Sequence, residues 1–365
     1  MLESKKTLAA ISAAFCGAGI LGLYVTPRSN GTNIIPFLVC IYVGAFLFWG
    51  LGVILPFLNV ITRVMANYAP KTLRLEEGEQ EGEEVFALSE PAPTTYFTMR
   101  KRILQIEGAQ GLIKACVPFI IKLVMLIVVY FTTHVYRAPA TVYGAIAQIV
   151  VNTIVEVLIS LPFEVIVARC IVTPYQLPWF HPTFSLRCLL SKAELRKPWI
   201  LYSIPGFASS LLLLSGVEVI AQRIYTGLNF YIAARARQPS HVADTGGIAL
   251  NILLIFVVFA VKWASGMPLK TVATRLAVQN IQKNAAIELD SEDMRDEVEA
   301  RRYSDDDDVV QLREELYTGL VDCIKGIVRE EGWRALYRGW MLCLVEGLRL
   351  TFAVIVFILH WYGVV

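Results

Sequence analysis

Three short segments of the chain repeat one pattern at a fixed interval. In each, a proline is followed seven residues later by an arginine, and successive prolines lie 106 residues apart. The segments are LPFLNVITR (55–63), LPFEVIVAR (161–169) and MPLKTVATR (267–275), with the pairs Pro56 and Arg63, Pro162 and Arg169, and Pro268 and Arg275. Self-similarity at a fixed period indicates repeated structural units, so we expect three similar units.

The hydropathy of the chain indicates a membrane protein. Hydrophobic residues make up 56% of the 365 residues and charged residues 18%, whereas about 25% of a soluble domain is charged. The mean hydropathy is +0.55. A spanning helix needs about 20 mostly apolar residues, so six or seven spans fit into the apolar stretches 7–26, 34–62, 116–133, 143–168, 201–221, 247–269 and 336–365.

Polar chemistry is sparse in this sequence. The seven cysteines have no paired spacing, and the four histidines form no close group, which argues against a disulfide framework or a metal site. A net charge of +2 without a basic stripe argues against a nucleic-acid partner. We find no nucleophile elbow, phosphate loop or Cys–His signature. We therefore expect no enzyme, no metal and no cofactor.

The chain divides into an N-terminal segment and three units. Residues 1–30 read as a signal peptide, a signal anchor or an extra helix. We favour a retained helix, because the apolar segment is long for a signal-peptide core and no convincing cleavage site follows. The repeats are predicted at 31–138, 139–241 and 242–365, each with a long helix ending near its Pro…Arg pair, a polar loop and a returning helix.

Two loops hold most of the charge. They contain LEEGEQEGEE (75–84) and DSEDMRDEVEARRYSDDDD (290–308), the latter within an acidic loop at 285–310. Such blocks are usually solvated and mobile, and the alternative is a docking site for a basic partner. Helical patterning resumes at 96–115 and 316–340, which predicts amphipathic helices on the membrane surface. Gly108 and Gly332 suit a chain reversal after them.

This arrangement resembles the mitochondrial carrier family. The family repeat reads Pro-x-acid-x-x-base-x-base, followed later by acid-Gly and aromatic-base-Gly, and the third unit matches best with MPLKTVATRL and DCIKGIVREEGWRALYRG. The resemblance covers residues 34 to 365. It implies an all-α membrane protein, a six-helix bundle with threefold pseudo-symmetry and short surface helices, to which the N-terminal segment adds an extra helix.

The ionic latch that this resemblance implies is largely missing. Carriers close one side with ion pairs between the acid of one repeat and the base of the next. Here the acid positions hold Leu58, Glu164 and Lys270, and the base positions hold Ile61, Val167 and Ala273. Glu164 and Lys270 could form one residual bridge, or both could snorkel to the interface. The prolines still bend their helices, so we interpret these segments as the remnant of a gate that is retained for shape.

Charged and polar residues inside predicted spans mark a candidate central cavity. Such charges are costly and usually face the protein interior. By the family pattern, Lys122, Ser209, Ser210 and Glu346 lie at the level of the binding site. The full candidate set is Lys122, Glu156, Ser209, Ser210, Lys262, Glu346 and Arg349. Internal pairing and a cavity for a zwitterionic ligand or lipid headgroup are both open.

A second candidate site would bind a lipid phosphate. The aromatic-base-Gly motif of the third unit precedes a helix, whose N-terminus can bind phosphate. Lys114 is the corresponding base of the first unit. The candidates are Lys114, Tyr337, Arg338 and Gly339.

The missing latch favours a carrier that no longer transports. The chain resembles the divergent, fusion-associated carrier-like proteins of the fungal outer membrane and their animal relatives. This implies an adaptor in mitochondrial fusion, membrane dynamics or lipid handling. Implied partners are membrane lipids, dynamin-like fusion GTPases and contact-site proteins, and an exposed polar interface could be a homodimer surface. The alternatives are a transporter of a small polar or zwitterionic solute, and a lipid scramblase or membrane-protein insertase.

Overall fold

The computed structural model describes most of the helical part of the chain. The described residues are 50–70, 95–134, 141–178, 181–236, 245–279, 301–304, 308–313, 315–345 and 347. The expected N-terminal helix within 1–30 and the acidic stretch 75–84 lie outside them. Within the described ranges, the regular elements are helical, with one isolated antiparallel bridge between Tyr175 and Arg302.

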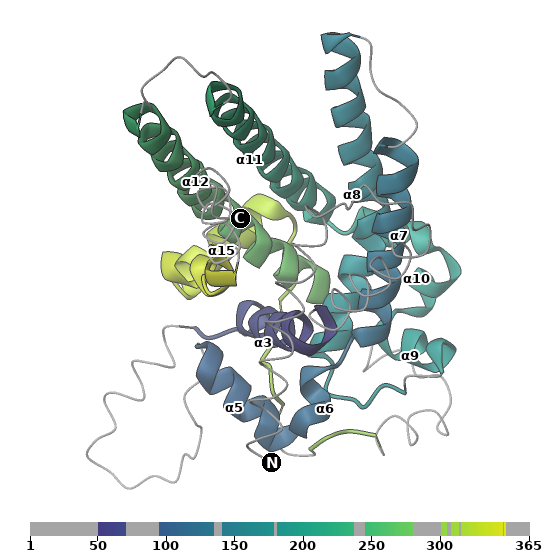
Figure 1. The fold of residues 1–365 in the computed structure, drawn as a ribbon. Helices are drawn as coiled ribbons and strands as arrows, with labels where there is room; N and C mark the ends of the chain where they lie inside the picture. The colour runs from purple at the N-terminus through teal and green to yellow at the C-terminus, as the bar shows by residue number, and fades with distance from the viewer. Residues whose placement is uncertain are drawn as a thin grey trace, which may run out of the picture.

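Figure 1 shows the described helices, which are grouped here by the three sequence units. The first unit holds η1 (Gly50–Ile54), α3 (Leu55–Ala66), α5 (Tyr96–Ile106), α6 (Gly108–Leu112) and α7 (Cys116–His134). The second holds α8 (Val142–Val172), α9 (Pro182–Leu189), α10 (Lys192–Arg196), η2 (Pro198–Ser203) and α11 (Phe207–Ala236). The third holds α12 (Thr245–Val278), α15 (Leu320–Glu330) and η3 (Trp333–Tyr337).

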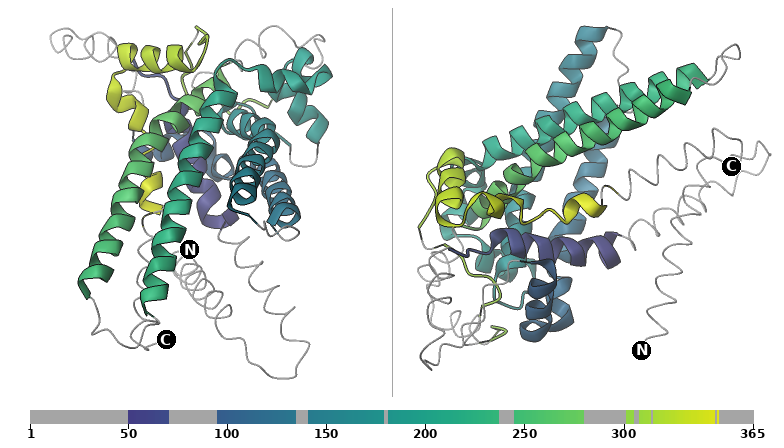
Figure 2. Two further views of the ribbon diagram at one scale, coloured as in Figure 1. Left: turned by 90° about the horizontal axis from the view of Figure 1, so that it is seen from above. Right: turned by 90° about the vertical axis from the view of Figure 1, so that its left-hand side faces the viewer.

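Four helical stretches are long and apolar enough to cross a membrane. They are Gly108–Leu126, Ile146–Val172, Phe207–Leu228 and Leu250–Val278, and a shorter apolar helix covers Gly52–Ala66. Helix α7 packs on α8, and α11 runs beside α12 along most of its length (Figure 2). The rest of the expected first and last spans lies outside the described residues.

The three proline-containing helices α3, α8 and α12 converge at one end of the molecule, where each contacts the other two. Pro162 lies inside α8 and Pro268 inside α12, while Pro56 lies in the first turn of α3. A proline removes a backbone donor from the helix ladder, and the π-helical turn η1 directly precedes α3, whose second residue is Pro56. The sequence therefore places these prolines at corresponding points of the three helices.

The main apolar core lies at this convergent end. Val60 of α3, Val165 of α8 and Val272 of α12 are buried there together with Met99 of α5 and Ile327 of α15. The parts of α8, α11 and α12 distant from this end expose many large apolar side chains, among them Ile146, Ile220 and Val257. Apolar surface on helices whose backbone groups are internally bonded suits a lipid surrounding.

The two segments for which surface helices were expected are helical, as α5 in the first unit and α15 in the third. Gly108 follows α5 with φ of 69° and Gly332 follows α15 with φ of 96°, a backbone region that favours glycine. The predicted chain reversals at both positions are confirmed. Gly206, which precedes α11, also has a positive φ, and a Cβ there would lie 2.2 Å from the backbone nitrogen of Leu320.

Candidate functional site

The three repeat arginines are buried at the convergent end. Each lies in the last turn of its helix, and their exposed fractions are 0% for Arg63, 0% for Arg169 and 3% for Arg275. A buried guanidinium is tolerated only when its charge is paired and its donors are bonded. The contacts of these three side chains therefore define the polar centre of the molecule.

Each arginine reaches into the next unit, and the three contacts close a ring. The Nε atom donates to the carbonyl oxygen that lies two residues beyond the arginine of the following unit. The bonds run from Arg63 to Ile171 (2.9 Å), from Arg169 to Ala277 (3.0 Å) and from Arg275 to Met65 (3.0 Å). These carbonyls belong to the ends of helices, where the last turn has no intrahelical partner. The arginine ring thus joins the ends of α3, α8 and α12.

A carboxylate from the following polar segment of the same unit neutralises each arginine. Arg63 contacts Glu107 at 2.6 Å through one nitrogen. Arg169 binds Glu194 through two nitrogens at 2.7 and 3.0 Å, and Arg275 binds Glu331 in the same way. Two parallel charge-assisted bonds combine strength with a fixed orientation, so the second and third pairs position the chain after α8 and α12.

The first unit departs from this scheme, because Glu107 serves two cations. The Nζ atom of Lys114 lies 3.3 Å from Glu107 and donates to the carbonyl oxygen of Thr173 at 2.5 Å. The Nη1 atom of Arg63 is buried without a hydrogen-bond partner among the residues that the structure describes. One carboxylate therefore balances two buried cations at this corner of the ring.

The ionisation of Glu194 follows from its surroundings. Burial opposes ionisation, but the hydrogen bonds and charge of Arg169 and the bonds from Ser191 outweigh it, so the pKa of Glu194 lies below its usual value. Ser191 and Glu194 also form a reciprocal capping box at the start of α10, an arrangement that satisfies two helix-start donors. Glu194 is thus ionised at neutral pH and serves both the arginine ring and the helix cap.

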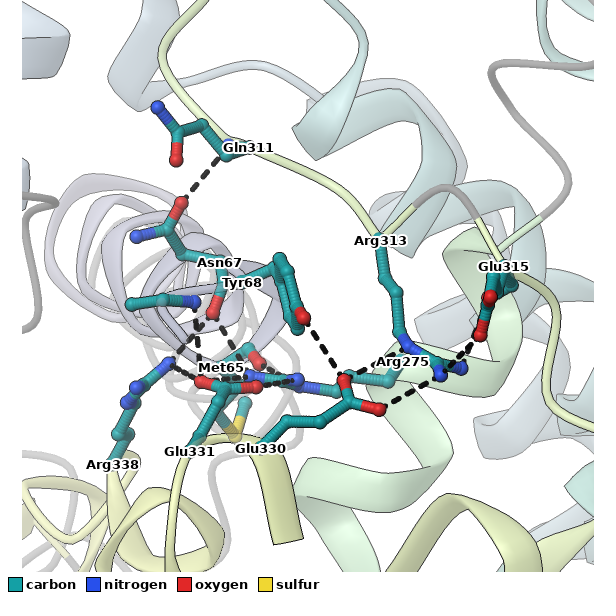
Figure 3. A network of polar contacts seen from close by, with 11 residues as sticks. Met65, Asn67, Tyr68, Arg275, Gln311, Arg313, Glu315, Glu330, Glu331 and Arg338 are labelled. Atoms are coloured by element: carbon teal, nitrogen blue, oxygen red, sulfur yellow. Dashed lines mark hydrogen bonds and ion pairs between the residues drawn. The ribbon is translucent and has the colours of Figure 1, made fainter. Parts of the chain in front are cut away.

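The third unit extends its pair into a wider network (Figure 3). Arg338 binds Glu331 at 2.5 Å and donates to the carbonyl oxygen of Asn67 at 2.7 Å. Next to them, Glu330 accepts hydrogen bonds from Tyr68 (3.0 Å) and Arg313 (2.9 and 3.0 Å). Burial, followed by the hydrogen bond to Glu330, raises the pKa of Tyr68 to about 12. The network ties the end of α3 to the end of α15.

The latch positions are filled mainly by packed apolar side chains. Ile61 and Ala273 are buried, and Val167 and Leu58 are partly buried against the core clusters. The residual bridge considered between Glu164 and Lys270 is not among the ion pairs of the described ranges. Glu164 instead pairs with Lys122 of α7, and Lys270 acts on the same carboxylate only electrostatically.

The candidates for a lipid phosphate are engaged inside the protein. The donors of Lys114 and Arg338 serve Glu107, Thr173, Glu331 and Asn67. The hydroxyl of Tyr337 donates to the carbonyl oxygen of Ala264 at 3.0 Å.

Gly339, the fourth member of that set, has a packing role. A Cβ atom there would lie 2.7 Å from the Cε atom of Met267 and 2.8 Å from the sulfur of Met65. The glycine thus permits close contact between the third unit and both of these methionines.

The candidates for a central cavity are scattered. Ser210 is buried and donates to the carbonyl oxygen of Phe207 at 2.7 Å, whereas Ser209 is exposed and donates to that of Gly206 at 2.9 Å. Glu156 is exposed, and Lys262 lies 5.8 Å from the ring centre of Trp263. Glu346 and Arg349 lie outside the described residues. Lys122 of this set forms an ion pair with Glu164 of the neighbouring helix α8.

Sequence reasoning missed the three carboxylates of the ring. A signal existed for two of them, since Glu107-Gly108 and Glu331-Gly332 repeat an acid-glycine dipeptide at the end of a surface helix. Glu194 is followed by leucine and carries no such signal.

These helices and this ring define an α-helical membrane protein whose units are joined through buried arginines. Residues 247–356 match the family model described as mitochondrial carrier protein. The match covers just under a third of the 365 residues and supports the mitochondrial carrier family, whose members are transporters and not enzymes. No curated protein matched the chain. The carrier domain and the four apolar helices suggest a multi-pass membrane protein of mitochondria.

Proposed function

We propose that this protein is a divergent carrier-fold protein of the mitochondrial outer membrane that acts as an adaptor in mitochondrial fusion, membrane dynamics or lipid handling. The observation that carries the proposal is the apolar filling of the latch positions. Ion pairs in a wet cavity can break and re-form at modest cost, but buried side chains such as Ile61 and Ala273 cannot act as a reversible latch.

The arginine ring supports the same reading. Opening this end would break three interunit bonds from buried guanidinium groups to carbonyl oxygens. Hydrogen bonds to charged groups contribute about 1.5–3 kcal/mol each, so opening costs roughly 5–9 kcal/mol unless other contacts replace them. An adaptor needs no such opening, whereas alternating access requires one in every cycle.

Protease protection on intact mitochondria tests the location. With an epitope tag in the loop 290–308, the proposal predicts cleavage while the outer membrane is still sealed. Protection until both membranes are opened would contradict it, because the loop of an inner-membrane carrier in the usual orientation faces the matrix. A second tag at the C-terminus is tested in parallel as the control. It shows that cleavage reports the topology of the chain and not the local structure of one loop.

The proposed partners are membrane lipids, dynamin-like fusion GTPases and contact-site proteins, by resemblance alone. The acidic residues of the loop 285–310 are the proposed docking surface. Crosslinking in mitochondria should recover a fusion GTPase with the unchanged chain and lose it when the acidic residues at 290–296 are made neutral. Equal recovery from both chains would refute this surface.

The ion pair of Lys122 and Glu164 supports a second candidate, a transporter of a small polar or zwitterionic solute. A zwitterion carries one charge of each sign and could replace the two partners of such a pair. This candidate predicts saturable exchange in proteoliposomes that is lost in Lys122→Ala and kept in Lys325→Ala, since Lys325 is exposed on α15. If no exchange is found across a panel of amino acids and related solutes, the transporter candidate is refuted and the adaptor proposal stands.

A further inference from the structure

A segment of the third unit crosses the arginine end of the molecule. We call residues 301–304 and 308–313 the strap, and residues 305–307 lie outside the described ranges. In the second unit, the strap pairs with the chain just beyond α8. Tyr175 and Arg302 form the antiparallel bridge. The backbone nitrogen of Gln176 donates to the carbonyl oxygen of Arg301 at 2.9 Å, and that of Tyr303 donates to the carbonyl oxygen of Pro174 at 3.3 Å.

The same strap pairs with the chain just beyond α3. The nitrogen of Tyr68 donates to the carbonyl oxygen of Gln311 at 2.8 Å, and the nitrogen of Gln311 donates to the side-chain oxygen of Asn67 at 2.9 Å. Figure 3 shows this part of the strap passing over Asn67 and Tyr68. Arg102 of α5 holds the carbonyl oxygen of Asp308 at 2.9 Å.

The strap leads directly to the third helix end. Shortly after it, the nitrogen of Tyr317 donates to the side chain of Gln279 at 3.1 Å. Asn67 and Gln279 each lie four residues beyond their arginine, and Pro174 lies five beyond Arg169. The strap and its continuation therefore meet the chain beyond all three ring arginines at nearly the same level.

Apolar and aromatic side chains hold the strap against the core. Val309 and Val310 are buried in the main core cluster. The ring of Tyr303 lies 4.8 Å from the Nζ atom of Lys114 and so covers the corner where Glu107 serves two cations. Burial, followed by the charge of Glu107, raises the pKa of Tyr303 to about 12, which keeps the phenol neutral beside that carboxylate.

We propose that the strap is a detachable closure of the arginine end, which takes the place of the side-chain latch that the sequence lacks. The strap is held by backbone hydrogen bonds, by Val309 and Val310, and by the pair of Arg313 with Glu330, whose side chains are 15% and 16% exposed. The ring beneath it is held by ion pairs whose side chains are at most 4% exposed. Local opening draws on the segments with the fewest buried contacts, so the strap leaves while the ring stays intact. The inference does not rest on the adaptor role, because a transporter could carry the same closure.

Cys170 is a native reporter of strap opening. Its exposed fraction is 5%, and it is buried in the same core cluster as Val309 and Val310 of the strap. Cys323 of α15 has an exposed fraction of 0% and lies on a helix that packs on α11 and α12, so it reports unfolding of the remaining fold. The full chain in detergent is treated with a maleimide, and labelling at each cysteine is followed by mass spectrometry.

One variant should release the strap, and a matched variant should not. Val309→Asp combined with Val310→Asp places two carboxylates in an apolar site, and we expect Cys170 to be labelled at least about tenfold faster with Cys323 unchanged. Asp308→Asn removes only the exposed ion pair to Arg302 and should stay within about twofold of the unchanged chain. Unchanged labelling of Cys170 in the first variant would overturn the proposal.

A crosslink decides the case in which the double aspartate variant unfolds and both cysteines react. Opposite residues in an antiparallel bridge have Cα atoms about 4.5–5.5 Å apart, within the range that a disulfide spans. Tyr175→Cys with Arg302→Cys should therefore lock the strap when oxidised and lower Cys170 labelling at least about fivefold relative to the reduced variant. Equal rates in the two redox states would show that strap opening does not control access, and would refute the closure.

Discussion

Replacing Glu194 by glutamine tests whether the arginine ring stabilises the fold as its geometry indicates. The substitution keeps the shape of the side chain but removes its charge, and it leaves Arg169 fully buried without a counter-ion. Removing one partner of a buried pair costs about 3–5 kcal/mol. Glutamine can still accept one hydrogen bond from the guanidinium, so we expect a loss near the lower limit, about 3 kcal/mol.

The measurement is thermal unfolding in detergent, followed by the reaction of a fluorogenic maleimide with buried thiols. For a chain of 365 residues, 1 kcal/mol corresponds to a shift of about 1–2 °C in the apparent midpoint, so the midpoint of Glu194→Gln should fall by roughly 3–6 °C. The control is Glu315→Gln, whose side chain is 81% exposed beside Arg313 and should matter by less than about 1 kcal/mol.

A second glutamine variant sharpens the comparison. Glu107→Gln leaves two buried cations, Arg63 and Lys114, without a carboxylate, so its midpoint should fall further than that of Glu194→Gln. If Glu194→Gln and Glu315→Gln have the same unfolding midpoint, the buried pair contributes no more to stability than an exposed one and the reasoning is refuted. If Glu107→Gln is the milder of the two buried variants, the assignment of two cations to one carboxylate is wrong.

Three further predictions concern the membrane pair, a glycine and acid stability. Lys122→Met should destabilise the protein by about 1–3 kcal/mol and more than Lys122→Met with Glu164→Met, because breaking a pair costs more than replacing it; equal melting of both variants would contradict this. Gly206→Ala should cost several kcal/mol, since its Cβ meets backbone, whereas Gly216→Ala, with nothing within 4 Å, should be neutral or slightly stabilising in the same assay. The folded-state pKa of Glu194 lies below 4.5, so its contribution to the free energy of unfolding is complete above about pH 4.5 and is lost as the pH falls through that lower pKa. When unfolding is measured from pH 7 to pH 3, Glu194→Gln should therefore lose less stability on acidification than the unchanged chain.

The sequence alone determined the features that repeat or that depend on near neighbours. The 106-residue period predicted corresponding prolines and arginines in three helices, and hydropathy predicted spanning segments at the positions of α7, α8, α11 and α12. The glycines at 108 and 332 predicted two chain reversals. These signals are periodic or local in the chain, so no knowledge of the packing was needed to find them.

Only the tertiary structure decided which partner each charge has. The ring carboxylates follow their arginines by 44, 25 and 56 residues, so no common spacing in the sequence points to them. Lys122 pairs with Glu164 because α7 packs on α8, although position in the repeat had suggested Lys270. The donors of Lys114 and Arg338 are engaged inside the protein for the same reason. A charge in a low-dielectric interior binds the partner that packing brings within reach, and packing depends on all three units at once.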